Sequence, residues 1–522
     1  MKPLFPKLSL IASAALALTA LIALTPITAQ AGPLDGASRA WTTQHSGATG
    51  FLSEVPAYDS LTRTLWVAGV SGVDVLNART GELVQRIDTR GFGNINSVSI
   101  HNGIAAMAFE SSVKTNPGSV RLFDTSSRDL LSGVNHIVVG ALPDMLTFTP
   151  DGSKLLVANE ATPTTYGVRT TAANSFPRSF AAAALDPLGS VSIIDMATRT
   201  VSSTATFAGV VRSGSHIRSN TGMDFEPEYI AVNKAGTKAY VTLQEANAMA
   251  VLNLQTGVFD SVIGLGAKDF SLGNNGNGIS NSIDPNDNGT IALINVNVKG
   301  LYMPDGLSLY ETGGQTFILM ANEGDFRADD ADRTRAGAAG LNATGILTRL
   351  RVSNTDSSPG NLFAAGARSF SIRREDGSIV YDSGNILDRE AIAAGIYDDG
   401  RSADKGVEPE SVEVMSIGAR SFAFVGLERT LQGALAVFDI TDPTNTQYVR
   451  MLINNGDRAP EGLKGYQVGN EFYIVMANEA SNTSTAFLLA VPEPGSLALS
   501  GLALAALLGL GRLNQRRQRR QG

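Results

Sequence analysis

Acidic residues recur at fixed spacing along the chain, and their side chains are those that bind hard metal ions. Five pairs lie 16 to 18 residues apart: Asp144/Glu160, Glu228/Glu245, Asp305/Glu323, Glu410/Glu428 and Glu461/Glu479. We call the first acid of each pair the opening acid and the second the closing acid. Glu54 is an opening acid with Gly69 at the closing position, and Glu110 is a closing acid with Asn96-Ser97 at the opening position. Carboxylates brought together raise one another's pKa unless cations compensate. Oxygen ligands without Cys or His suit Ca²⁺ or Mg²⁺.

Each acid pair flanks a segment that has the pattern of a β-hairpin. In residues 304–325, Gly306 to Tyr310 predicts one strand, residues 311–314 a turn, and Thr316 to Ala321 the return strand. An antiparallel hairpin brings its two ends together. Asp305 and Glu323 are therefore expected at the same sheet edge.

The hairpin recurs seven times, so the sequence predicts a repeat fold. The return strands are at 65–69, 104–110, 155–160, 239–245, 317–323, 422–428 and 473–479. A third alternating strand often follows and ends in Asp or Asn, as in Ser190–Asp195. Repeats of about 40–50 residues with about four strands indicate a propeller. We predict an all-β, seven-bladed propeller, closed by pairing an N-terminal strand near Trp41–Gly50 with the C-terminal strands.

In a propeller the first strand of each blade lines the central channel. The opening acids Glu54, Asp144, Glu228, Asp305, Glu410 and Glu461 should then ring one mouth and bind a divalent cation. The closing acids should stand behind them as a second layer: Glu110, Glu160, Glu245, Glu323, Glu428 and Glu479. The alternative is structural: the acids cap backbone N–H groups and pair with Arg429, Lys405 or water.

Two segments, 161–227 and 324–409, are too long for one blade and are predicted to be surface insertions. The second contains its own strand pair, Ala367–Arg373 and Ser378–Tyr381.

A further loop, Asp284-Pro-Asn286-Asp287-Asn288-Gly289, matches the start of an EF-hand calcium loop. Asp284, Asn286 and Asn288 would supply the ligands. Position 12 is Asn295 where an EF-hand has Glu, and an Asn/Asp-rich turn explains the segment equally well.

Composition limits the possible partners and chemistries. The formal charge is −8, and without seven bases at the two ends 34 basic residues face 49 acidic ones, which gives −15. Such a body repels nucleic acid. The chain has no Cys, which excludes disulfides, thiolate zinc sites and Cys nucleophiles. The four histidines, at 45, 101, 136 and 216, lack metalloprotease spacing and are expected to be ordinary surface or turn residues.

Both ends carry targeting signals. Residues 1–31 combine Lys2 and Lys7, an apolar run and Ala29-Gln30-Ala31, which is typical of a secretory signal peptide. The C-terminus has Val491-Pro492-Glu493-Pro494, an apolar segment at 496–511 and an arginine cluster. This tail resembles the PEP-CTERM sorting signal, which implies export and processing by an exosortase. A plain C-terminal membrane anchor is the alternative.

The region 45–490 resembles the choice-of-anchor I domain family. The resemblance rests on the following segments: Ala141–Gly152, Leu155–Glu160, Tyr302–Gly306, Ala321–Asp325, Ala367–Ile372, Glu408–Glu410, Gly426–Arg429 and Ala459–Leu463. It implies an exported β-propeller whose members carry different C-terminal anchors. The predicted organisation is therefore a signal peptide (1–31), a propeller (32–490) and a PEP-CTERM sorting and membrane segment (491–522).

Two functions remain open from the sequence. The favoured one is a cell-surface or extracellular-matrix binding protein that holds a divalent cation at its acidic funnel. The other is a metal-dependent phosphoesterase, because some members of the resembled family are labelled alkaline phosphatase-like. No G-x-S-x-G elbow, P-loop or glycosidase signature is present, and the candidates for phosphate-binding cations are Arg327, Arg333, Arg335 and Arg429.

Overall fold

The computed structural model describes residues 34–45, 51–133, 136–165, 167–219, 225–326 and 331–489. Ser38–Leu489 forms one compact unit, and of the other unit (1–37 with 490–522) only residues 34–37 are described. The predicted signal peptide, the sorting motif at 491–494, the apolar segment at 496–511 and Arg327 therefore lie outside the described residues. Within the described part of the chain, no helix is both long and apolar enough to cross a membrane.

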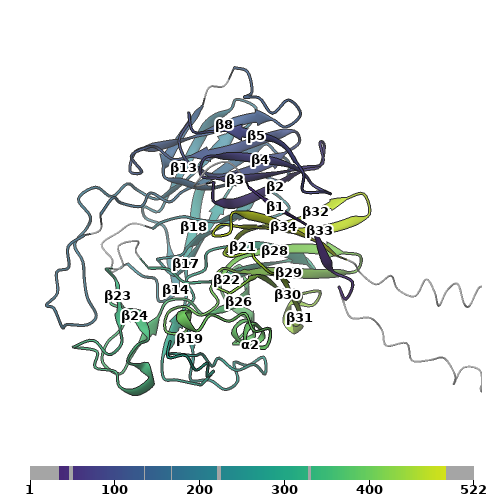
Figure 1. Ribbon diagram of the computed structural model, residues 1–522. Coiled ribbons are helices and arrows are strands. Elements are labelled where there is room, and N and C mark those ends of the chain that lie inside the picture. The colour runs from purple at the N-terminus through teal and green to yellow at the C-terminus, as the bar shows by residue number, and fades with distance from the viewer. Residues whose placement is uncertain are drawn as a thin grey trace, which may run out of the picture. The chain divides into compact units, whose positions relative to one another are not determined.

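The fold is all-β, as predicted (Figure 1). Seven sheets in the described residues, numbered 1 to 7 in chain order, each contain four strands that pair antiparallel with their neighbours; sheet 4 has a fifth strand, and sheet 7 takes its fourth strand from the N-terminal end. Sheet 1 contains β2 (Ser53–Asp59), β3 (Thr64–Gly69), β4 (Gly72–Asn77) and β5 (Leu83–Asp88). Sheet 2 contains β6 (Ile95–His101), β7 (Ile104–Phe109), β8 (Pro117–Asp124) and β9 (Ile137–Ala141). Sheet 3 contains β10 (Pro143–Phe148), β11 (Lys154–Asn159), β12 (Ser190–Asp195) and β13 (Thr200–Thr206).

The remaining sheets repeat this order with additions. Sheet 4 contains β15 (Ile230–Val232), β16 (Lys238–Leu243), β17 (Ala248–Asn253) and β18 (Val258–Leu265), and β14 (Arg212–Ser215) pairs in parallel with β18. Sheet 5 contains β21 (Leu307–Thr312), β22 (Gln315–Asn322), β26 (Ser369–Arg374) and β27 (Ile379–Asp382). Sheet 6 contains β28 (Pro409–Ile417), β29 (Arg420–Leu427), β30 (Gly433–Asp439) and β31 (Gln447–Asn454). Sheet 7 contains β32 (Pro460–Val468), β33 (Glu471–Asn478), β34 (Thr483–Leu489) and β1 (Ser38–Gln44).

Apolar runs place the second and third strand of each sheet in the core. Every residue of β3 is buried, whereas the fourth strand β13 alternates between exposed positions and positions that are partly or fully buried. The buried side chains form separate layers between consecutive sheets, such as Trp66 with Met107 and Leu156 with Val241. The first strands contact one another in sequence order, and β32 also contacts β2. Four-stranded antiparallel sheets packed face to face around their first strands are characteristic of a β-propeller.

Asp and Asn side chains fix the turns that follow the third strands, as the sequence predicts. Asp195 Oδ1 accepts hydrogen bonds from Ala197 N at 3.0 Å and Thr198 N at 2.9 Å, and Asn77 Oδ1 accepts one from Arg79 N at 2.9 Å. These Asx turns satisfy backbone donors that the sheets leave unpaired.

The strand pair predicted as part of the second insertion is instead part of a sheet. β26 pairs with β22 and β27 pairs with β26, so they are the third and fourth strands of sheet 5. The prediction placed them on a surface excursion because their distance along the chain from β22 hides the pairing. Additional segments thus enter sheets 3 and 5 at the same point, between the second and third strands.

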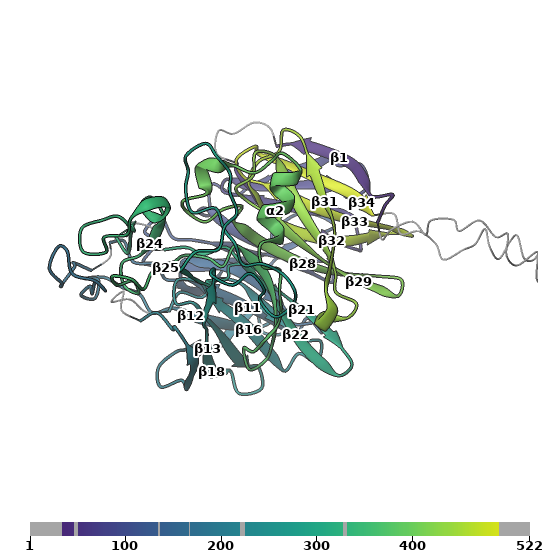
Figure 2. The ribbon, with the colours of Figure 1, turned by 90° about the horizontal axis from the view of Figure 1, so that it is seen from below.

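The segment between β22 and β26 and the connections from β18 to β21 and from β27 to β28 carry short elements of their own. They are β19 (Ala267–Asp269), β20 (Lys299–Leu301), β23 (Arg333–Arg335), η1 (Gly345–Leu347), β24 (Arg351–Ser353), β25 (Phe363–Ala364), α2 (Ile386–Ala393) and η2 (Asp399–Arg401). A last short helix, η3 (Pro443–Asn445), precedes β31. In both views β24 lies away from the four-stranded sheets (Figures 1 and 2). The segments after β11 and β22 contact each other, because Arg178 N donates to Asn354 O at 2.7 Å.

The first and the last strand of the described propeller share a sheet. β1 pairs antiparallel with β34, with Ser38 opposite Leu488. Just after β1, the buried His45 joins sheet 7 to sheet 1: its Nδ1 is 2.8 Å from Asp74 Oδ2 and its Nε2 is 2.8 Å from Ser484 Oγ.

Candidate metal centre

One cavity of about 650 Å³ gathers nearly all of the predicted acids. It is lined by all six opening acids, Glu54, Asp144, Glu228, Asp305, Glu410 and Glu461, and by five of the six closing acids, Glu110, Glu160, Glu323, Glu428 and Glu479. Glu245 is not among the lining residues, but the charge of Glu160 raises its pKa, as burial also does. Eleven of the twelve acids therefore line one cavity. We call this cavity the acidic funnel.

A bulge at the start of each first strand positions the opening acid. In sheet 3, Pro143 pairs with Asn159 but Leu146 pairs with Val157, so Asp144 and Met145 share one opposite residue. The same shift surrounds Glu54, Glu410 and Glu461. In sheet 5, Asp305 N donates to Ala321 O and Ala321 N donates to Gly306 O, so two residues again face one. A bulge changes the direction of a side chain relative to a regular strand. At these positions the side chain is that of the opening acid.

Strained backbone precedes five of these bulges. The residue two positions before the acid has φ between 43° and 53° and is not Gly: Leu52, Leu142, Met303, Glu408 and Ala459. A left-handed conformation in such residues costs about 1–3 kcal/mol and persists only where the surroundings impose it. The repeated strain indicates that the direction of the acids is fixed by the fold.

The closing acids are held beside the opening acids by backbone hydrogen bonds. Glu160 N donates to Leu142 O at 2.9 Å, and Glu479 N donates to Ala459 O at 2.8 Å. Each acceptor is the left-handed residue of the facing strand. The predicted proximity of Asp305 and Glu323 is therefore a general property of the hairpins.

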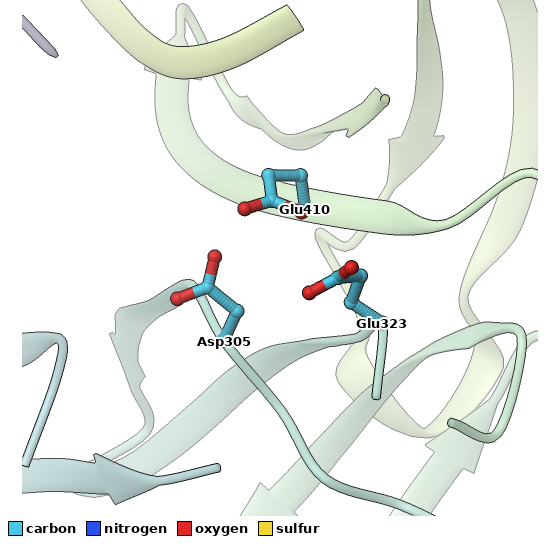
Figure 3. A group of neighbouring side chains, drawn as sticks. All are labelled: Asp305, Glu323 and Glu410. Atoms are coloured by element: carbon cyan, nitrogen blue, oxygen red, sulfur yellow. The ribbon is translucent and has the colours of Figure 1, made fainter. Parts of the chain in front are cut away.

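Three groups of carboxylates are compact enough to bind one ion each. Within each group, one oxygen per residue lies within 4.8 Å of the others: Asp305/Glu323/Glu410, Glu323/Glu408/Glu428 and Glu428/Glu461/Glu479. Figure 3 shows Asp305, Glu323 and Glu410 turned toward one another. Oxygen-only groups of this size suit Ca²⁺ or Mg²⁺.

Cations line only part of the funnel. We call the part of the funnel that carries acids from sheets 5 and 6 the 5–6 side. There, Lys405 Nζ is 2.5 Å from Glu323 Oε1 and 2.9 Å from Glu408 Oε2. Arg401 Nη2 is 2.5 Å from Glu408 Oε1, and Arg429 Nη2 is 2.7 Å from Glu428 Oε1. These contacts match the structural alternative predicted for Lys405 and Arg429.

The opposite part, which we call the 1–4 side, carries acids from sheets 1 to 4 and has no ion pair to them in the described residues. The acids that line it are Glu54, Glu110, Asp144, Glu160 and Glu228; Glu226 and Glu245 of sheet 4 do not line the cavity. Oε2 of Glu228 and Oε2 of Glu245 are buried without a hydrogen-bond partner. The same holds for Oε2 of Glu410 and Glu461. A buried carboxylate oxygen without a donor is costly unless a proton or a cation satisfies it.

The protonation of the funnel acids reflects this crowding. Burial, together with the charges of Glu461 and Asp144, raises the pKa of Glu54 to about 9. Burial and the charges of Asp305 and Glu479 raise the pKa of Glu461 to about 8. For Glu323 burial again dominates, but the ammonium of Lys405 opposes it and the pKa rises only to about 7.

Several funnel residues were missed by the sequence reasoning. Glu408 shares a Glu-Pro-Glu segment with the opening acid Glu410, so a search for that repeat could have found it; Glu226 shares such a segment with Glu228 but does not line the funnel. Arg401 and Gln244 carry no such signal. Gln244 Nε2 donates to Glu323 Oε2 at 2.8 Å.

The other predicted residues lie elsewhere or do other work. Arg333 lines the funnel together with Arg429, but Arg335 lies 3.9 Å from Asp287 and does not. Both oxygens of Asp284 accept backbone hydrogen bonds, from Asn286 N at 3.1 Å and Ala292 N at 3.0 Å. This geometry is that of the Asn/Asp-rich turn; calcium binding by Asp284, Asn286 and Asn288 stays a prediction.

Solved structures with a similar fold have little sequence in common with this chain. The chain resembles hydrazine synthase from Kuenenia stuttgartiensis (10% identity, TM-score 0.47, covering 86% of this chain and 98% of that one). It also resembles the Cps50 (Swd1) β-propeller domain of Myceliophteria thermophila (10% identity, TM-score 0.44, 87% and 100%). The Pan2 WD40 domain of Neurospora crassa gives 10% identity and TM-score 0.43, with 88% and 96% covered. No curated protein matches the sequence.

Family models match both predicted parts of the chain. The PEP-CTERM protein-sorting motif matches residues 490–517, which indicates an exported protein that is anchored in the membrane before processing. Such a motif implies exosortase and the secretion machinery as partners. The choice-of-anchor I domain matches residues 54–443, a range that runs from β2 of sheet 1 to the turn before β31 of sheet 6 and holds most of the funnel. The chain belongs to the choice-of-anchor I domain family.

Proposed function

We propose that this chain is a cell-surface or extracellular-matrix binding protein, and that its acidic funnel holds a divalent cation through which a ligand is bound. The observation that carries the proposal is the convergence of thirteen acidic and only four basic side chains on one cavity. Buried oxygens of Glu410 and Glu461 lack donors. A cation would neutralise these groups and leave coordination positions open toward the cavity for a ligand.

The proposed scaffold is a closed ring of seven blades, sheets 1 to 7. Two observations support closure: β32 contacts β2, and β1 completes sheet 7 by pairing with β34. In a closed ring every sheet packs between two others, so the starts of the first strands are held at fixed positions around the funnel. Asp305, Glu323 and Glu410 are the residues expected to bind the ion, with Glu461 beside them.

A thermal-unfolding experiment tests the cation. An ion that binds only the folded state raises stability by about 2.7 kcal/mol at a hundredfold excess over Kd. The Tm of the exported protein should rise with Ca²⁺ or Mg²⁺ and fall with chelator, and D305N/E410Q should lose most of this response. E82Q, at an exposed turn far from the funnel, serves as the matched control. Identical melting of the wild type with and without divalent ions would refute the cation site.

The second function is a metal-dependent phosphoesterase, favoured by one observation: Lys405, Arg401 and Arg429 line the same cavity as the acids. These cations could hold an anionic phosphoester beside the ion. We expect no turnover of a generic phosphomonoester with Ca²⁺, Mg²⁺ or Mn²⁺. Turnover that chelator and D305N/E410Q both abolish would instead establish the enzyme.

Processing at the sorting motif is also open to direct measurement. We propose cleavage near Pro492–Pro494 during export. Mass spectrometry of the surface-released protein should find a C-terminus in this region; a membrane fraction that still ends at Gly522 would exclude processing.

A further inference from the structure

A short hairpin between β22 and β26 has one apolar face and one face of arginines. In this hairpin Arg335 of β23 pairs with Arg351 of β24, and directly opposite residues of an antiparallel pair point to the same side. Leu350 and Val352, which flank Arg351, are fully buried in an apolar cluster. Because side chains alternate along a strand, Arg351 and Arg335 point away from that cluster. We call Arg335, Arg351 and the neighbouring Arg349 the arginine surface.

The arginine surface has few partners within the protein. Arg349 Nη2 is 2.7 Å from Asp287 Oδ2, whereas Arg335 Nη2 is 3.9 Å from the same oxygen. Arg351 Nε is 3.5 Å from Asp404 Oδ2, and its guanidinium makes no hydrogen bond in the part of the chain that the structure describes. Arg335, Arg349 and Arg351 are 38%, 56% and 32% exposed, so a ligand in solution can reach them.

This arrangement places like charges next to one another. Arg335 and Arg351 are direct cross-strand neighbours, and like charges at such positions destabilise the pairing. Arg335 and Arg349 contact the same carboxylate, that of Asp287. Burial, together with the charges of Arg351 and Arg349, lowers the pKa of Arg335. An anion bound between the three guanidinium groups would relieve their repulsion.

The arginine surface is continuous with the wall of the acidic funnel. Asp404 does not belong to Arg351 alone: Arg333 Nη1 and Arg401 Nη2 each lie 3.5 Å from its carboxylate. Arg333 and Arg401 both line the funnel, as Lys405 does directly after Asp404 in the chain. A ligand whose one end lies in the funnel can therefore extend over basic side chains to the rim.

We propose that Arg335, Arg349 and Arg351 form an oxyanion-binding surface at the rim of the funnel, and that the ligand is a polyanion with phosphate or carboxylate groups. A guanidinium offers two parallel N–H donors to such a group, and these charge-assisted hydrogen bonds are stronger than neutral ones. One group of the ligand binds this surface and another binds the cation of the funnel. The inference names the ligand class of the proposed binding function and rests on it, but the arginine surface itself does not need the cation.

Binding of two probes to the exported protein tests the surface. The probes are inorganic polyphosphate and polygalacturonate, and the one that binds the wild type more tightly shows whether phosphate or carboxylate is recognised. Loss of a hydrogen bond to a charged group weakens binding about tenfold or more. R335Q/R349Q/R351Q should therefore bind this probe at least about a hundredfold more weakly than the wild type. A wild type that binds neither probe would overturn the proposal.

A matched control removes the same charge elsewhere. Three exposed arginines lie near the turns between first and second strands, at the ends of their sheets away from the opening acids: Arg79, Arg374 and Arg420. R79Q/R374Q/R420Q should bind the probe as the wild type does. Equal losses of affinity in the two triple variants would show that net charge alone drives binding, and the arginine surface would not be a site.

Repeating the titrations in chelator and with D305N/E410Q separates this surface from the cation site. Binding that persists under both conditions but is lost in R335Q/R349Q/R351Q supports the arginine surface even if the cation site fails. Binding that chelator abolishes and the arginine variant retains would overturn the proposal and leave the cation site standing. If the triple variant does not fold, R351Q removes only a 3.5 Å contact and should still weaken binding about tenfold.

Discussion

The 5–6 side and the 1–4 side of the acidic funnel carry carboxylates at equivalent positions, but the additional segment between β27 and β28 places cations only on the 5–6 side. There Lys405 and Arg401, which precede β28, pair with Glu323 and Glu408. On the 1–4 side Glu228 keeps an unpartnered oxygen. Carboxylates at equivalent repeat positions can therefore be paired with a cation of the protein itself on one side of the funnel and lack such a partner on the other. The additional segment, and not the repeat itself, determines which acids are paired with a cation of the protein.

The largest expected effect comes from removing the built-in cation. K405M leaves Glu323 and Glu408 buried without their shared partner, and breaking such a pair costs roughly 3–5 kcal/mol. The loss, measured by urea unfolding in chelator, should be smaller below the pKa of Glu323, which is about 7, since a protonated Glu323 needs no cation. K464M, which removes a half-exposed partner of Glu413, should cost no more than about 1 kcal/mol. Equal losses of unfolding free energy in K405M and K464M would contradict the distinction between the 5–6 side and the 1–4 side.

An intermediate effect should appear in the pH dependence of the 1–4 side. The folded-state pKa of Glu54 is about 9, above the ordinary value of 4.5, so the folded protein binds the proton more tightly than the unfolded chain. The stability of the wild type in chelator should then fall as pH rises from about 4.5 through about 9. E54Q cannot ionise, so it should match the wild type at low pH and exceed it at high pH. Parallel pH profiles for the two proteins would contradict this prediction.

The smallest effect is expected at the Asp284 loop, where both carboxylate oxygens of Asp284 already accept hydrogen bonds. D284A removes two hydrogen bonds to backbone N–H groups and should cost about 1–3 kcal/mol of unfolding free energy. The number of bound Ca²⁺ ions should not change. A lower ion count in D284A would show that acid composition, and not unpartnered oxygens, identifies the cation sites of this chain.

The sequence predicted the recurring parts of the funnel well because hairpins impose local geometry. Asp305 and Glu323 meet because a short turn forces the two strand ends together, and the same reasoning holds for Asp144 and Glu160. The prediction for β26 was wrong because β26 pairs with β22, from which a long insertion separates it along the chain. It also hid Arg401, since nothing in a repeat pattern indicates where an insertion will direct its side chains. The bulges at the opening acids could be identified only from the strand register of the structure.

The pairing of β1 with β34 has a consequence for the order of events during export. Trp41 leaves the translocation channel early, yet its partner Ala486 leaves about 445 residues later, close to the sorting motif. Contacts of such long sequence separation form slowly, because the loop between them must be ordered first. Until then β1 and His45 lack Ser484 and its neighbours, and sheet 7 keeps an unpaired edge. Sheet 7 can thus be completed only after β34 (Thr483–Leu489) has emerged, immediately before the matched sorting motif at 490–517.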